Sequence, residues 1–293
     1  MTMIERAFQN IPQHPSERIT DGKSKPQNAD FAILDLAQQE ENVLLGWLYS
    51  HFEHKEIPWI SLYFGSEQNS DWKAGPILVE LRGFDDFQNA LIERCRTEYL
   101  SVLIHARDVS LATMAGHLRS LITVQLDNKP ALFRFYDPRS LGPLLEVLEP
   151  AQRQRLTGPA ERWSWYQYQN WHQWEAQAGS ATPTTKKALS ISAAQRVQMD
   201  TARSRQFAQS LTHTYRAHIP DDDAETFVMN EVQAASSAGL TRLADQERWL
   251  RMALKVQRPL IESPQWCAIV QSGEKTAAQI LNQLECEQGC TAC

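Results

Sequence analysis

The sequence has no long apolar run and no excess of positive charge. No stretch of its 293 residues approaches the roughly 18 to 20 apolar residues that span a bilayer. Residues 1–26 also lack the apolar segment of a signal peptide. Lysine and arginine number 29 against 35 aspartate and glutamate residues, so the surplus of cations typical of nucleic-acid binders is missing. We therefore expect a cytoplasmic protein that binds neither membrane nor nucleic acid.

Motifs that bind phosphates or carry out hydrolysis are missing as well. The glycines form neither G-x-x-x-x-G-K nor G-x-G-x-x-G, and G-x-S-x-G and H-E-x-x-H do not occur. The five cysteines are an odd number, which indicates reduced thiols. Cys286, Cys290 and Cys293 stand in the last eight residues, but structural zinc usually takes four protein ligands. We predict no cofactor and no metal, with free thiols in a Cys-rich tail.

Cys95, His105 and Asp108 are the residues from which a nucleophile, a base and an orienting group could be assembled. However, Cys95 shares a helical apolar face with Phe87 and Leu91, and His105 ends an apolar strand. Both positions are typical of packing residues, so we predict no catalytic residue and no enzyme. A Cys/His-dependent hydrolase built on Cys95 and His105 is the alternative.

Short apolar runs and helical spacings alternate in the first half of the chain. The runs predict strands at 31–36, 59–64, 76–81, 99–105, 122–126, 131–136 and 162–166. Four-residue spacings and caps predict helices at 41–50, 84–96, 110–120 and from 138 onward. This mixture indicates an α/β or α+β lobe with a mixed sheet over residues 30–175. Residues 1–29, which have no apolar period, are expected to be a flexible leader.

The second half of the chain differs from the first in composition and in the spacing of its apolar residues. Residues 176–190 are small and polar, which predicts a linker. Residues 191–285 show helical spacing throughout, as in Phe207, Leu211 and Tyr215. We therefore predict a smaller all-helical C-terminal lobe, followed by the Cys-rich tail at 286–293.

Large aromatic residues are concentrated between positions 163 and 174, where six of twelve residues are Trp or Tyr. Packing of the two lobes is one interpretation of this cluster. An exposed contact for a protein partner is the other, since Trp and Tyr dominate binding hot spots. We take Trp171 and Trp174, together with Trp249 of the helical lobe, as candidate partner-binding residues.

Two short segments carry a recognisable pattern: residues 117–121 read HLRSL and residues 133–139 read FRFYDPR. The order LYFG at 62–65, GPILV at 75–79 and Gly158-Pro159 before a Trp-rich strand extends the pattern over about residues 30–168. It resembles the domain of type VI secretion effector adaptors, the Tap/TEC family of VgrG-loading chaperones. The resemblance implies a protein that binds a cognate toxic effector in the cytoplasm and loads it onto the VgrG spike without catalysis. A structural baseplate component is a weaker interpretation.

Physical chemistry already gives the motif residues a structural role. Asp137 can cap a helix whose first residue is Pro138. Arginines of the motif can pair with carboxylates such as Asp35 or Asp137. We therefore predict that the motif residues are mostly architectural: His117, Arg119, Arg134, Tyr136, Asp137 and Arg139.

Overall fold

The structure is a computed structural model that describes residues 20–22, 26, 28–52, 56, 58–127, 129–176, 188–219, 223–271 and 275–287. Its contacts divide the chain into two compact units, Met1–Val197 and Gln198–Cys293. The first combines sheets and helices, and the second is helical, so the predicted fold class is confirmed.

A seven-stranded antiparallel sheet forms the centre of the first unit, with the order β1-β9-β8-β5-β2-β4-β3. Its strands are β1 (Thr20–Gly22), β2 (Phe31–Asp35), β3 (Trp59–Ser61), β4 (Pro76–Glu80), β5 (Ser101–His105), β8 (Arg162–Gln167) and β9 (Asn170–Glu175). All five residues of β2 and of β5 are buried, as expected of central strands covered on both faces.

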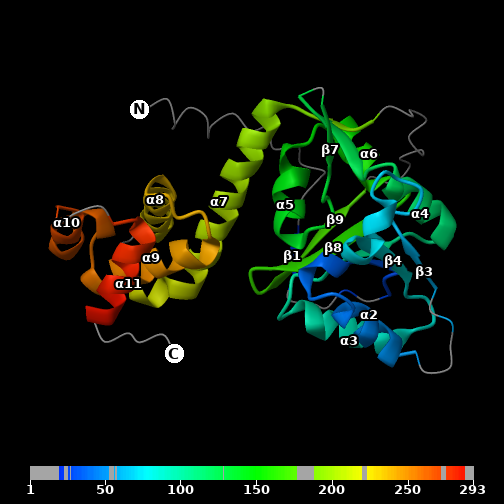
Figure 1. Cartoon of the computed structure of the whole chain (residues 1–293), viewed down its shortest axis with the longest axis horizontal. Coiled ribbons are helices and arrows are strands. Elements are labelled where there is room, and N and C mark those ends of the chain that lie inside the picture. The colour runs from blue at the N-terminus through cyan, green and yellow to red at the C-terminus, as the bar shows by residue number, and fades with distance from the viewer. Residues whose placement is uncertain are drawn as a thin grey trace. The chain divides into compact units, whose positions relative to one another are not determined.

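Helices cover the two faces of this sheet (Figure 1). α2 (Val43–Ser50) and α3 (Asp85–Cys95) pack on the face that carries Ala32, Leu34 and Leu103. α4 (Leu111–Arg119) and α5 (Pro138–Val147) lie on the opposite face, where α5 contacts β8. α6 (Pro150–Thr157) follows α5 directly. The alternating burial of strand side chains thus supplies two apolar cores.

A second, mixed sheet of three strands has the order β10-β6-β7. β6 (Thr123–Leu126) and β7 (Lys129–Leu132) form the predicted hairpin, and β10 (Ser190–Ile191) pairs in parallel with β6. The predicted second arm was too long, because the FRFYD segment leaves the sheet after Leu132 and turns into α5. Residues 133–136 are therefore not part of the strand that was predicted at 131–136.

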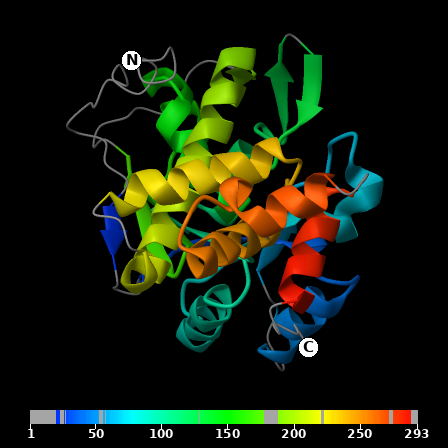
Figure 2. The same cartoon turned by 90° about the vertical axis from the view of Figure 1, so that its left-hand side faces the viewer.

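The second unit is an all-helical cluster, coloured yellow to red in Figure 2. It contains most of α7 (Ala193–Tyr215) with η3 (Arg216–His218), α8 (Ala224–Ser237), α9 (Leu243–Val256), η4 (Leu260–Glu262), α10 (Pro264–Gln271) and α11 (Ala277–Glu287). Trp249, Leu260 and Leu281 are fully buried at its centre. The predicted smaller helical lobe is confirmed.

The predicted segment boundaries need correction in two places. Thr20–Gly22 of the expected leader form β1 on the edge of β9. Leu189 and Ser190 of the expected linker belong to the first unit, where Leu189 is buried and Ser190 begins β10. The boundary between the units falls inside the continuous helix α7. The polar composition of residues 176–190 could not predict a boundary at that place. Residues 1–19, 177–187 and 288–293, with Cys290 and Cys293, lie outside the described residues.

None of the helices in the described ranges combines the length and the apolar character that crossing a bilayer requires.

Candidate partner-binding surface

Asp35 is the centre of a corner built from distant parts of the chain. It ends β2, is 1% exposed, and its carboxylate accepts hydrogen bonds from Ala37 N (3.2 Å) and Gln38 Nε2 (2.9 Å). The bond from Ala37 N caps η1 (Leu36–Gln38). Arg134 of the FRFYDPR segment donates to the same carboxylate, so the predicted pairing with Asp35 is confirmed. Burial of the carboxylate requires such partners, because an unpaired charge inside a protein is costly.

Tyr136 connects this corner to the segment that follows β3. Its side chain is buried and forms a hydrogen bond with Tyr63, and burial together with that bond raises the pKa of Tyr136. The ring of Tyr63 lies directly on Gly75: a Cβ added there would be 2.4 Å from Tyr63 Cδ2. Glycine is therefore needed at position 75 for close packing, and the GPILV segment is fixed against the corner.

Arg119 has a different partner from the one expected. It pairs with no carboxylate of the corner; its Nε and Nη2 donate to the carbonyl oxygen of Ser61 at 3.2 and 2.8 Å. β3 is the last strand of the sheet. Its hydrogen bonds with β4 are made at Pro58 O and Leu62 N, so Ser61 O, which lies between them, points away from β4. Arg119 thus covers part of an open sheet edge.

His117 and Gly158 make a second close contact. His117 Nε2 lies 3.1 Å from the carbonyl oxygen of Leu156, and because a carbonyl only accepts, Nε2 carries the proton. Gly158 has φ of 55°, and a Cβ there would be 2.2 Å from His117 Nε2. The HLR segment is thereby fixed to the Gly-Pro turn that precedes β8.

Asp137 and Arg139 complete the motif. Asp137 caps α5 by accepting from Arg139 N (2.9 Å), as predicted, and its carboxylate also binds the Arg139 guanidinium at 2.9 and 2.8 Å. The Arg139 guanidinium lies over the ring of Tyr99, 5.7 Å from the centroid. All six motif residues therefore make contacts within the first unit.

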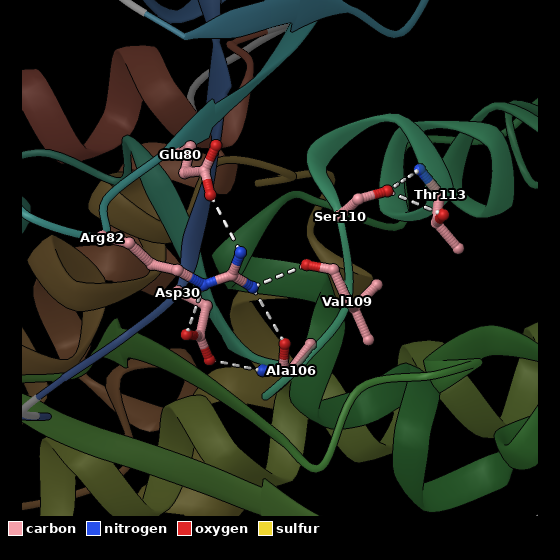
Figure 3. A network of polar contacts seen from close by, with 7 residues as sticks. All are labelled: Asp30, Glu80, Arg82, Ala106, Val109, Ser110 and Thr113. Atoms are coloured by element: carbon pink, nitrogen blue, oxygen red, sulfur yellow. Dashed lines mark hydrogen bonds and ion pairs between the residues drawn. The ribbon is translucent and has the colours of Figure 1, made fainter.

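A second polar network, missed in the sequence, fixes the other end of β2 (Figure 3). Arg82 donates to Asp30 (2.8 Å), Glu80 (2.9 Å) and the carbonyl oxygens of Ala106 (3.1 Å) and Val109 (2.7 Å). Asp30 accepts in turn from Ala106 N at 2.7 Å. Since these bonds satisfy both charged groups internally, the network stabilises strand ends and offers nothing for a ligand.

The tryptophans chosen as partner contacts are core residues. Trp171 is 1%, Trp174 4% and Trp249 0% exposed. Trp171 packs in the core shared with α2 and α3, and Trp249 packs edge-on against Trp266 in the helical unit. This corrects the expectation of an exposed aromatic contact at these positions, since their apolar surface is already buried.

Cys95 and His105 do not form a catalytic pair. Cys95 is buried against the backbone of Ser101 at the start of β5, and burial raises the pKa of its thiol to about 12. His105 ends the same strand, about 13 Å beyond Ser101 at the usual rise per residue, and its Nδ1 lies 3.0 Å from Arg162 Nη2. A buried, protonated thiol far from the imidazole has neither a base nor nucleophilic character.

Among the described residues, no three His, Cys, Asp or Glu side chains gather closely enough to hold an ion.

Four aromatic side chains form a connected surface beside the corner, and we call them the aromatic strip: Tyr49, Trp59, Phe64 and Trp72. The rings of Trp59 and Trp72 stack at 5.8 Å, and Phe64 lies 6.0 Å from Trp72. Trp59 Nε1 donates to the hydroxyl of Tyr49 at 3.3 Å. Tyr49 is 55% and Phe64 42% exposed, while both tryptophans are half-buried against the core.

The motif corner supports this strip. Phe64 follows Tyr63 in the chain, and Trp72 lies in η2 (Asn69–Ala74), whose last turn is closed by Gly75 N donating to Trp72 O at 3.1 Å. η1 and η2 also contact each other. Sequence reasoning missed the strip because Trp59 begins an apolar run that predicts a strand, and Trp72 stands alone between Asp71 and Lys73. Only the strand order shows that β3 is an edge.

Family comparison covers this same region. Residues 31–155 match the family model described as Domain of unknown function (DUF4123). The matched range contains the motif corner and the aromatic strip, but neither the β8–β9 hairpin nor the helical unit. No curated protein and no solved structure matches the chain.

Proposed function

We propose that this protein is a cytoplasmic adaptor of a bacterial type VI secretion system, which binds a cognate toxic effector and loads it onto the VgrG spike. The proposal rests on the motif corner, in which the HLR and FRFYDPR segments that resemble effector adaptors join β2, β3 and α5. This corner lies inside the range that matches DUF4123. The resembling residues therefore act as one structural unit.

Binding without catalysis fits the chemistry of the described residues. The polar groups of the corner and of the Arg82 network bind one another, and the Cys95 thiol is buried. The aromatic strip, by contrast, exposes rings of the kind that dominate protein-binding hot spots. An adaptor needs a surface of this kind and no reacting group.

Affinity purification of the tagged full chain from cells that also express its neighbouring genes tests the proposal. We expect one large effector protein to be retained, with or without VgrG. Deleting the gene should stop secretion of that effector alone. Loss of all type VI secretion would instead indicate a baseplate component, and a purified protein without effector or VgrG would contradict the adaptor role.

A further inference from the structure

We infer that the aromatic strip is the part of this protein that recognises its partner, and that it binds a segment rich in arginine or lysine. This inference rests on the proposed adaptor function and adds the binding surface and the chemistry of the bound segment. It follows from three features of the first unit: the partly exposed rings of the strip, the acidic segment that carries them and the covered strand edge.

The rings of the strip are arranged to accept flat or cationic groups. Trp59 and Trp72 stack with an interplanar angle of 22°, and each has one part in the core and another in solvent. The core contacts hold the rings in place, so little side-chain entropy is lost on binding. Arginine and lysine bind the faces of tryptophan rings through cation–π interactions, most strongly where water is displaced.

The described part of the segment that carries the strip, positions 40–74, is acidic. Among the described residues between positions 40 and 74, the carboxylates are all exposed: Glu40, Glu41, Glu56, Glu67 and Asp71. Within those same positions the one lysine described is Lys73, and it is paired with Glu41 at 3.3 Å. A basic segment is complementary to this surface, whereas an acidic segment would be repelled.

The covered edge of β3 limits the ways in which the segment can bind. A strand added beside β3 would need the outward carbonyl of Ser61, but the Arg119 guanidinium already occupies it. Binding by main-chain pairing is therefore obstructed, and side-chain contacts with the rings remain. The other exposed large apolar side chains described in this unit come from four separate parts of the chain: Val43, Tyr99, Leu132 and Val197.

The test uses the full chain and the effector retained in the affinity purification. An array of overlapping 15-residue peptides of that effector, a length chosen to be of the order of one binding segment, identifies the bound segment. We expect the bound peptides to contain at least two arginine or lysine residues. Bound peptides that lack basic residues would overturn the inference and leave the adaptor function standing. Purification that retains no effector at all would overturn both.

Dissociation constants of the bound peptide then test the strip directly. Trp59→Ala and Trp72→Ala should each weaken binding about tenfold or more, in the range of hot-spot residues. The matched control Leu132→Ala, at a side chain 47% exposed on the small sheet, should bind as the parent does. Equal affinity of parent and tryptophan variants would contradict the inference.

Charge reversal provides a second measurement that does not depend on the core. Glu67→Lys and Asp71→Lys change exposed side chains and should leave the thermal midpoint almost unchanged. We expect weaker binding at low salt and a shallower decrease of affinity with added salt. If a tryptophan variant fails to fold, the two charge-reversal variants alone test the inference. An unchanged salt dependence of binding would then contradict it.

Discussion

The guanidinium of Arg134 donates to the carboxylate of Asp35, although 99 positions separate the two residues in the sequence. The pair joins the segment after β7 to the end of β2 and the start of η1. Asp35 is almost completely buried, whereas the Arg134 side chain is 45% exposed. The carboxylate therefore depends on this contact far more than the guanidinium does.

Removing the cation should destabilise the first unit. Arg134→Met leaves the buried Asp35 carboxylate with only the bonds from Ala37 and Gln38. Loss of one partner of a buried pair costs several kcal/mol, and the exposure of Arg134 reduces that figure to about 2 kcal/mol. Urea denaturation measured at pH 7 gives the change in the free energy of unfolding.

Arg139→Met is the matched control for this prediction. Arg139 is similarly exposed, at 41%, but its partner Asp137 is two residues away and caps α5 independently of the arginine. We expect a loss below about 1 kcal/mol for this local, partly exposed pair. Equal losses in the two variants would show that Arg134 has no special role. The double variant Asp35→Asn with Arg134→Met should be less destabilised than the sum of the two single variants.

Pairings governed by local chemistry could be predicted from the sequence. The Asp137 cap and the two strands of the hairpin at 123–132 followed from residue types and spacing, whereas Asp35–Arg134 was one of several arginine–carboxylate pairs that the residue types left open. The partner of Arg119 could not be predicted, because it is a backbone carbonyl whose outward direction depends on the order of the strands. That order results from pairings between residues far apart in the chain.

The exposure of tryptophans was also beyond sequence reasoning. Trp171 pairs with Tyr166 across the β8–β9 hairpin. β1 pairs with the other edge of β9, so Trp171 lies on an inner strand of the sheet. Trp59 occupies the opposite end of the same sheet, where no further described strand follows β3. Both residues are tryptophans on short strands, and the residue type does not distinguish an inner strand from an edge.

Gly75→Ala should disturb the aromatic strip through Tyr63. The added methyl group would lie 2.4 to 2.8 Å from three atoms of the Tyr63 ring, so the ring must shift, which disturbs its hydrogen bond with Tyr136. Overpacking of this kind costs about 1 to 3 kcal/mol. Thermal unfolding should show the loss, and hydrogen exchange of residues 62–75 should become faster. Gly116→Ala, where the new methyl group meets nothing within 4 Å, is the control and should be neutral or stabilising; the prediction fails if the two variants behave alike.

The first unit should lose stability in acid. Burial, together with the nearby Arg162, lowers the pKa of His105 to about 4, and burial lowers the pKa of His117 to about 4, both from an ordinary value of 6.5. The unfolded chain therefore takes up protons first. The stability contributed by these neutral imidazoles is fully present above pH 6.5 and is lost as the pH falls towards 4.

A variant without one of these imidazoles provides the measurement. His117→Gln keeps an Nε2 donor for the Leu156 carbonyl but cannot be protonated. Between pH 7.5 and pH 5, values chosen on either side of about 6.5, the urea midpoint of the parent should fall more than that of the variant. Parallel changes in the two proteins would show that His117 does not contribute to acid sensitivity.

Glu231 should make the helical unit respond to pH in the opposite direction. It is 2% exposed, and its Oε2 accepts from Trp249 Nε1 (2.8 Å) and Leu260 N (3.2 Å), while burial raises its pKa. A raised carboxyl pKa means that the folded unit binds the proton more tightly than the unfolded chain. The stability that this provides is therefore present at low pH and lost as the pH rises through the folded-state pKa.

Glu231→Gln tests this relation while keeping an acceptor for both donors. At pH 7.5 the neutral amide avoids the desolvation of a buried charge, so we expect slower hydrogen exchange in α8 and α9 than in the parent at the same pH. Towards pH 4, close to the ordinary carboxyl pKa of about 4.3, the difference should vanish because Glu231 is then protonated. Faster exchange in the variant at pH 7.5 would mean that the charged carboxylate holds Trp249 and η4 more strongly than its burial costs. The unit would then depend on the ion, and its stability would rise with pH like that of the first unit.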